Sequence, residues 1–352
     1  MTRLLRNPLV WLPLCTILLG LVAWRSRVWE APERLGAVEP LPLLAATALC
    51  ALIAVLWALR SADLLAAAGR PVPAATLVPM TAFANTINNL TPGSVGELLR
   101  LYLLRAHHGV DYATGAAVVL IERVVAIGYL SGSALLLWLA VLDLVPLPAV
   151  VLGLVLLAGL PGLLYRMGLR PTAMLTELPL GGPLGPERWA RWSAGLGRTD
   201  ATIARLLGDP RRATVFAIST AAVLACYTAQ LWLVAWAVGV TLDPIAAWAI
   251  LGLGITAGVL SLLPFGLGAT DVVIVGLLGT QGVPPLEAAA ITFGYRLVST
   301  LPLGVAGGLS YALLAASLPQ SGTSGALQAA RAGLAQADAP AAEAPAPSAA
   351  DR

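Results

Sequence analysis

Residues 112–142 read YATGAAVVLIERVVAIGYLSGSALLLWLAVL, and this stretch decides the class of fold. It is apolar almost throughout and longer than the roughly 20 residues that an α-helix needs to cross the bilayer core. Its charged residues are Glu122 and Arg123. At a rise of about 1.5 Å per residue, Arg123 lies roughly 16 Å into the span, near the bilayer midplane. The stretch therefore predicts a membrane-spanning helix that carries charge at its centre.

The rest of the chain has the composition of a membrane protein. Of its 352 residues, 58% are hydrophobic and 11% are charged, whereas a soluble domain has about 25% charged residues. A soluble fold of this length cannot bury so much apolar surface, and no nucleic-acid partner is expected. Every basic residue other than histidine is arginine. This reflects either genome composition or the binding of phosphate headgroups by guanidinium groups.

Apolar runs divide the chain into spans and broken segments. The predicted full spans are residues 8–24, 41–59, 112–142, 145–165, 213–239 and 285–317. Two further apolar stretches, 74–95 and 245–281, contain the breaks TAFANTINNLTPG (81–93) and SLLPFGLG (261–268). Backbone freed at such breaks is tolerated in a membrane only inside protein or along a wet cavity. We therefore expect an all-α polytopic bundle with about six full spans and two re-entrant helical hairpins.

Arginine in the loops predicts the orientation. The 166–212 loop is rich in arginine and should therefore lie on the cytoplasmic side of the membrane. Both termini should lie on the same side, and we expect the protein to be in the plasma membrane. Arg60, Arg70, Arg100 and Arg105 fall on the same side in this topology. The first hairpin then enters from the cytoplasm and the second from outside. Residues 187–207 form either an amphipathic surface helix or an ordinary loop.

The domain prediction separates the membrane region from a tail. Residues 1–317 form the transmembrane domain, and residues 318–352 form a disordered, Ala/Pro-rich cytoplasmic tail. Within the domain, halves 41–142 and 213–317 each read span, broken hairpin, span. The interval from Pro92 to Arg123 is almost the same as that from Pro264 to Arg296. Opposed repeats of this kind are typical of secondary transporters, whose site lies where the repeats meet.

The arginines within spans carry the functional argument. A central arginine is unfavourable by about 2.5–3.5 kcal/mol on insertion scales, so Arg123 and Arg296 need partners. Glu122 points about 100° away from its neighbour Arg123, so the two should not pair. Glu97 and Asp271, just after the two breaks, are the predicted partners. The arginines either form structural ion pairs or contact an anionic headgroup, and the two roles can coexist.

Other polar groups lie near the breaks. The predicted hairpin tips contain Gly93, Gly96, Gly266 and Gly268. Glycine there either permits a tight turn or allows backbone N–H groups to point at a phosphate. The amides that line the path or hydrogen-bond between helices are Asn85, Asn88 and Asn89. No hydrolase, zinc or nucleotide-binding pattern is visible. We therefore expect no enzyme activity, no cofactor and no metal site.

Together these residues carry a resemblance. The stretch PGSVGELLRLYLL (92–104), the pair Glu122-Arg123, the stretch LPFGLGATD (263–271) and Arg296 resemble the flippase-like membrane region of lysylphosphatidylglycerol synthase, the multiple peptide resistance factor family. The resemblance implies movement of a lipid between leaflets, without the synthase domain. The functional positions that it implies are Glu97, Arg100, Glu122, Arg123, Asp271 and Arg296. The chain departs from the family pattern at Thr270-Asp271, where an Arg-Glu pair is usual.

The leading hypothesis is therefore a lipid flippase. Its substrate would be an anionic phospholipid, an aminoacyl-phospholipid or a polyprenyl-phosphate lipid. Its expected partners are membrane lipids, and a separate lipid-modifying enzyme is a further possible partner. The alternatives are a secondary transporter of a small soluble anion and a non-catalytic membrane partner of a lipid synthase. A lateral gap toward lipid would favour the flippase, and a closed, walled site would favour a solute carrier.

Overall fold

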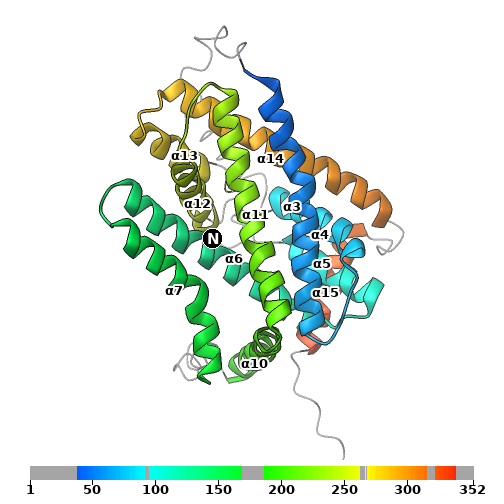
Figure 1. Ribbon diagram of the computed structural model, residues 1–352. Helices are drawn as coiled ribbons and strands as arrows, with labels where there is room; N and C mark the ends of the chain where they lie inside the picture. Colours follow the sequence, from blue (N-terminus) through cyan, green and yellow to red (C-terminus); the bar gives the residue numbers. More distant parts are fainter. Residues whose placement is uncertain are drawn as a thin grey trace, which may run out of the picture.

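A computed structural model describes residues 38–91, 95–168, 186–261, 266, 268–314 and 322–337, and the regular elements in these ranges are helices (Figure 1). In chain order they are α3 (Pro40–Ala67), α4 (Ala74–Leu90), α5 (Val95–His108), α6 (Tyr112–Val141), α7 (Leu147–Arg166), α10 (Pro186–Gly208), α11 (Pro210–Ala237), α12 (Pro244–Ser261), α13 (Ala269–Thr280), α14 (Pro285–Leu314) and α15 (Gly322–Ala337). The all-α prediction is confirmed for this part of the chain.

The outer surface of the bundle is apolar. On α14, Leu297, Leu301, Val305 and Leu309 are 59–66% exposed, and their regular spacing along the helix places them on one face. Such a continuous exposed apolar stripe is foreign to soluble proteins. Five helices in the described ranges are long and apolar enough to cross a membrane. The chain is a multi-pass membrane protein whose exterior is suited to lipid.

Two groups of four helices repeat the same order of lengths. Helices α3, α4, α5 and α6 have 28, 17, 14 and 30 residues, and α11, α12, α13 and α14 have 28, 18, 12 and 30. Helix α3 runs alongside α11, while α12 packs on α6 and α14 packs on α4 (Figure 1). The bundle has two apolar cores: one is built mainly from the first group and includes Leu64, Leu77 and Leu99, and the other is built mainly from the second group and includes Leu231, Ile250 and Ile274.

The breaks between the helices follow from local chemistry. Thr91 is extended, with φ −128° and ψ 146°, because a residue before proline avoids the helical region. In the second group, Gly268 has φ +82°, a conformation that favours glycine. Gly109 and Gly282, just after α5 and α13, likewise have φ +62° and +78°. Each broken segment therefore folds as two short helices that pack against each other.

The boundaries of the first broken segment require a correction. Its second arm is α5 (Val95–His108), whereas the predicted hairpin ended at residue 95. The sequence hid this arm because Glu97, Arg100 and Arg105 interrupt its apolar pattern. Neither the count of six full spans nor re-entrant insertion is confirmed. Residues 8–24 lie outside the described ranges, and α12, predicted as a hairpin arm, is itself long enough to span.

Two segments outside the predicted spans are helical. Helix α10 (Pro186–Gly208) confirms the helical alternative for residues 187–207. Helix α15 (Gly322–Ala337) corrects the prediction of a wholly disordered tail. It packs against α5 and α6, and its Ala326 and Ala330 are fully buried. Small side chains allow this close packing although the segment has too few large apolar residues to fold alone. Residues 338–352 lie outside the described ranges.

Candidate functional site

A cavity of about 430 Å³ lies between the two groups of helices. Its walls come from α3, α4, α5 and α6 on one side and from α11, α12, α13 and α14 on the other. The predicted site residues that line it are Asn85, Asn88, Asn89, Glu97, Arg100, Glu122, Arg123, Gly266 and Arg296. Arg123 and Arg296, which belong to opposite halves of the chain, therefore face one common space.

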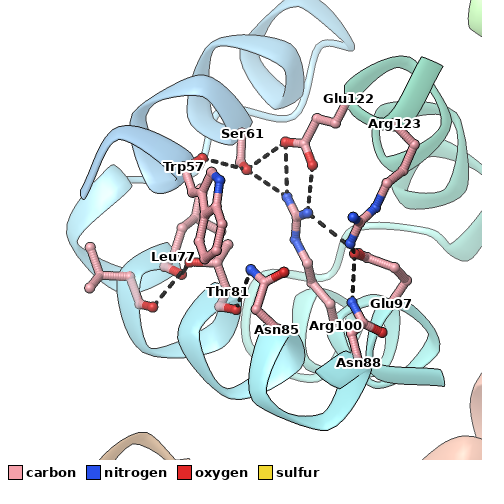
Figure 2. Close-up of polar contacts among 11 residues, drawn as sticks. Trp57, Ser61, Leu77, Thr81, Asn85, Asn88, Glu97, Arg100, Glu122 and Arg123 are labelled. Carbon is pink, nitrogen blue, oxygen red and sulfur yellow. Dashed lines mark hydrogen bonds and ion pairs between the residues drawn. The ribbon is translucent and has the colours of Figure 1, made fainter. Parts of the chain in front are cut away.

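The predicted ion pair between Arg123 and Glu97 is confirmed (Figure 2). Glu97 lies in the first turn of α5, so it projects from the start of the second arm toward α6. Asn88 on α4 also donates a hydrogen bond to the Glu97 carboxylate, at 2.9 Å. The Arg123 side chain is 45% exposed and that of Glu97 is 11% exposed. The pair thus joins both arms of the segment to α6 and leaves part of the guanidinium open to the cavity.

The second predicted pair, between Arg296 and Asp271, is also confirmed. The Arg296 Nε donates to Asp271 Oδ1 at 2.7 Å, and the backbone N–H of Gly268 donates to Oδ2 at 2.9 Å. Asp271, in the first turn of α13, therefore caps its own helix while it holds α14. Arg296 lies as far beyond the start of α14 as Arg123 lies beyond the start of α6. The two pairs thus occupy matching places in the two halves.

Glu122 belongs to a separate, more deeply buried cluster. Its two carboxylate oxygens accept hydrogen bonds from Arg100 on α5 at 2.6 and 3.2 Å (Figure 2). The Ser61 hydroxyl on α3 donates to the same carboxylate at 2.6 Å and accepts from Arg100 at 2.6 Å. Glu122 does not pair with its neighbour Arg123, as predicted. Its actual partners come from two other helices, which no local spacing in the sequence indicates.

This cluster is a structural clamp. The Arg100 and Glu122 side chains are 5% and 6% exposed, so their charges are nearly removed from water. Breaking such a pair by removing one partner is strongly destabilising because the other charge stays buried. Arg100 Nη1 also lies 3.6 Å from Glu97 Oε2. Arg100 therefore links the clamp of Glu122 and Ser61 to the pair of Glu97 and Arg123.

The asparagines have different roles despite their proximity. Asn88 donates a hydrogen bond to Glu97 across the two arms, which confirms the predicted bond between helices, and it also lines the cavity. Asn85 donates to the carbonyl of Thr81 in its own helix, at 2.9 Å, and also lines the cavity. Asn89 lines the cavity too. The polar wall of the cavity on α4 is thus made largely by these amides.

The glycines serve close packing more clearly than ligand contact. Gly96 lies in the first turn of α5 and not at a hairpin tip, which corrects the prediction. A methyl group there would lie 1.9 Å from the carbonyl oxygen of Ala84 on α4. In the other segment, a methyl group on Gly266 would lie 2.9 Å from the Cα of Gly258, and Gly268 caps the start of α13. Gly93 lies outside the described residues.

Several residues that the sequence analysis did not assign to the site line the cavity. Arg60 was counted as a loop charge, but it lies inside α3 and is only 8% exposed. The apolar run stops at residue 59 while the helix continues to Ala67, so the helix end carries Arg60 and Ser61 into the bundle. Trp57 and Tyr227, whose ring centroids are 6.2 Å apart, line the same space. For Arg60 and Ser61, the signal in the sequence was a polar dipeptide at the end of a predicted span.

The cavity wall is apolar elsewhere. Val223 and Leu224 on α11 and Ile255 and Val259 on α12 face the same space as the arginines. Val259 is also 41% exposed, so protein does not completely cover this wall. In the described part of the chain, no group of three or more His, Cys, Asp or Glu side chains is arranged to hold a metal ion. The geometry suits an anion that carries an apolar portion.

Comparison with known proteins gives one family. The family model described as "Lysylphosphatidylglycerol synthase TM region" matches residues 9–307. These residues include both groups of four helices apart from the end of α14. No curated protein matches the chain.

Proposed function

Because the chain belongs to the lysylphosphatidylglycerol synthase TM region family, we propose that it is a lipid transporter that moves an anionic lipid between leaflets. The match covers the membrane region of this family, and we propose transport as the activity of that region. The observation that carries the proposal is the cavity shared by Arg123 and Arg296. Its substrates are an anionic phospholipid, an aminoacyl-phospholipid or a polyprenyl-phosphate lipid.

The pairing of the two halves supports alternating access. An inverted repeat predicts the same order of helices in both halves and equivalent residues at equivalent positions. Arg123 and Arg296 are such a pair, and so are their partners Glu97 and Asp271. In such transporters the binding site lies near the midplane where the repeats meet. We propose that the segments α4–α5 and α12–α13 are re-entrant hairpins that enter from opposite faces. The protein would sit in the plasma membrane with both termini in the cytoplasm.

The walls of the cavity favour a lipid over a soluble anion. At about 430 Å³, its volume lies within the range of about 300–1,000 Å³ for small-ligand sites. It can hold a headgroup but not two acyl chains as well. We propose that the apolar wall, which includes the half-exposed Val259, gives the acyl chains a path from the cavity to the surrounding lipid.

Reconstitution in proteoliposomes tests the proposal. Fluorescent phosphatidylglycerol in the outer leaflet is quenched by dithionite, and the protected fraction reports transfer. Arg123→Gln and Arg296→Gln each remove a charged hydrogen-bond donor worth about 1.5–3 kcal/mol, so we expect transfer to slow about ten- to hundredfold. Arg105→Gln, at an exposed arginine near the end of α5, is the matched control and should keep the wild-type rate.

Folding must be checked because each substitution leaves a carboxylate unpaired. Glu97→Gln combined with Arg123→Gln removes both charges of that pair, and size-exclusion chromatography in detergent reports the folded fraction. Unchanged transfer in folded Arg123→Gln and Arg296→Gln protein would refute the headgroup role. Accumulation of radiolabelled phosphate inside the vesicles, without lipid transfer, would instead establish the soluble-anion carrier.

A further inference from the structure

Among the described residues, Arg60 is the cation in the cavity that no carboxylate neutralises. Its side chain lines the cavity from α3, although the residue is only 8% exposed. In the same part of the chain it makes no ion pair or hydrogen bond, and its Nε is a buried donor without an acceptor. Arginine keeps its proton in proteins. A permanent charge is therefore held in the bundle beside an open space.

The surrounding charges do not compensate it. Arg100 pairs with Glu122, Arg123 with Glu97, and Arg296 with Asp271. Glu122 attracts Arg60, but among the described residues no hydrogen bond or ion pair joins the two, and the carboxylate of Glu122 is bonded to Arg100 and Ser61 instead. Arg100 and Arg123 add like charges nearby. In the described part of the site, four guanidinium groups against three carboxylates leave one positive charge.

The second half shows that this charge is not required by the fold. Gln230 lies as far beyond the start of α11 as Arg60 lies beyond the start of α3. Gln230 is fully buried and donates to the carbonyl of Ala46 at 2.9 Å. A neutral side chain therefore serves at the matching position. The first half, and not the second, places an unpaired cation at the cavity.

From these observations we infer that Arg60 is the anion anchor of the cavity and binds a phosphate oxyanion, either a phosphate ester headgroup or free phosphate. A buried unpaired charge is unfavourable until a counter-charge reaches it, and a guanidinium fork matches two phosphate oxygens at once. Tyr227 and Trp57 line the cavity with it. The lipid form of the inference rests on the proposed function. Arg123 and Arg296, each held by its acid, then position the hairpins and assist binding.

The test measures ligand-dependent thermal stability of the full chain in neutral detergent. The probes are inorganic phosphate, with chloride at equal ionic strength as the blank, and short-chain phosphatidylglycerol. We expect at least one probe to raise the wild-type melting temperature saturably. Arg60→Gln, which copies the side chain at position 230, should weaken that Kd about ten- to hundredfold. Arg105→Gln should leave the Kd unchanged.

Stability without ligand gives a second, independent readout. Removing an uncompensated buried charge should leave the melting temperature of unliganded Arg60→Gln equal to or above that of the wild type. If Arg60→Gln melts lower without ligand and binds both probes with wild-type Kd, Arg60 is a packing residue and the inference is overturned. The absence of saturable binding of either probe to the wild type overturns it as well.

The outcomes separate this inference from the proposed function. Phosphate binding that depends on Arg60, in a protein that transfers no lipid, supports the anchor and removes the lipid transporter. Lipid transfer by a wild type whose Kd is insensitive to Arg60→Gln supports the transporter and removes the anchor. An Arg60-dependent response to phosphatidylglycerol but not to inorganic phosphate supports the anchor and identifies the headgroup as the source of the anion.

Discussion

Replacing Glu122 by glutamine should destabilise the protein more than any comparable change at its surface. In the wild type, Glu122 accepts hydrogen bonds of 2.6 and 3.2 Å from Arg100 and of 2.6 Å from Ser61. Both members of the ion pair are at most 6% exposed. Glutamine retains one acceptor oxygen, but its amide nitrogen faces the guanidinium donors and its charge is absent. Arg100 then joins Arg60 as a buried cation without full compensation.

The size of the effect follows from the burial of both partners. Breaking a buried ion pair by removing one member typically lowers stability by about 3–5 kcal/mol. Since 1 kcal/mol shifts the melting temperature by about 2–4 °C for chains of about 150–250 residues, we expect a decrease of roughly 6–20 °C. Intrinsic fluorescence reports the transition, because the chain has 10 tryptophans. Glu39→Gln, at an exposed glutamate, is the matched control and should change stability by less than about 0.5 kcal/mol.

A double-mutant cycle tests the electrostatic cause. If charge coupling dominates, Arg100→Gln combined with Glu122→Gln should be more stable than the sum of the two single effects by about 2 kcal/mol or more. Additive single effects would show that the two side chains contribute independently. A melting temperature of Glu122→Gln within about 2 °C of the wild type, less than about 1 kcal/mol, would refute the clamp, since Arg100 would then have found other compensation.

Three further outcomes are expected from thermal unfolding in detergent. Gly96→Ala should lose about 1–3 kcal/mol because its methyl group would overlap a backbone carbonyl of α4, whereas Gly128→Ala, which meets no atom within 4 Å, should not destabilise. Asp271→Asn should lower the melting temperature more than Asp271→Asn combined with Arg296→Gln, because the single change leaves Arg296 without its carboxylate partner. An equal decrease in melting temperature would contradict the pairing. Asp111→Ala should lose about 1 kcal/mol at neutral pH, since its carboxylate caps α6, and Asp111→Asn should match the wild type only at acid pH.

The pH dependence of the α6 cap has a definite sign. Burial opposes ionisation of Asp111, but the hydrogen bonds donated by Thr114 outweigh it and lower the pKa of that carboxyl group. A carboxyl group whose pKa is lower in the folded state stabilises the protein above its unfolded pKa, near about 3.9. This contribution is lost as the pH falls through the lower, folded value. The stability gap between wild type and Asp111→Asn should therefore close below about pH 4.

Several features could be predicted because they are local. Apolar runs and their lengths indicated membrane helices, and Pro92, Gly266 and Gly268 marked the breaks, since proline and glycine act on adjacent backbone. The acids that follow the breaks were matched to their arginines because similar spacing recurs in both halves. The resemblance to the lysylphosphatidylglycerol synthase membrane region rested on the same short stretches. Family membership is shown, whereas the orientation in the bilayer, six full spans and the transported lipid stay predictions.

Other features depend on which helices cross. Helix α5 was not predicted as a hairpin arm because its charged residues interrupt the apolar pattern. The partners that satisfy Arg100, Ser61 and Glu122, lie 39 and 22 residues away from it in the chain. Arg60 looked like a loop charge because an apolar run ends before its helix does. The amino-acid pattern thus determined where this chain forms helices and where they break, since those are properties of neighbouring residues. The tertiary structure alone decided which charges meet and which one is left unpaired, because that depends on distances between helices far apart in the chain.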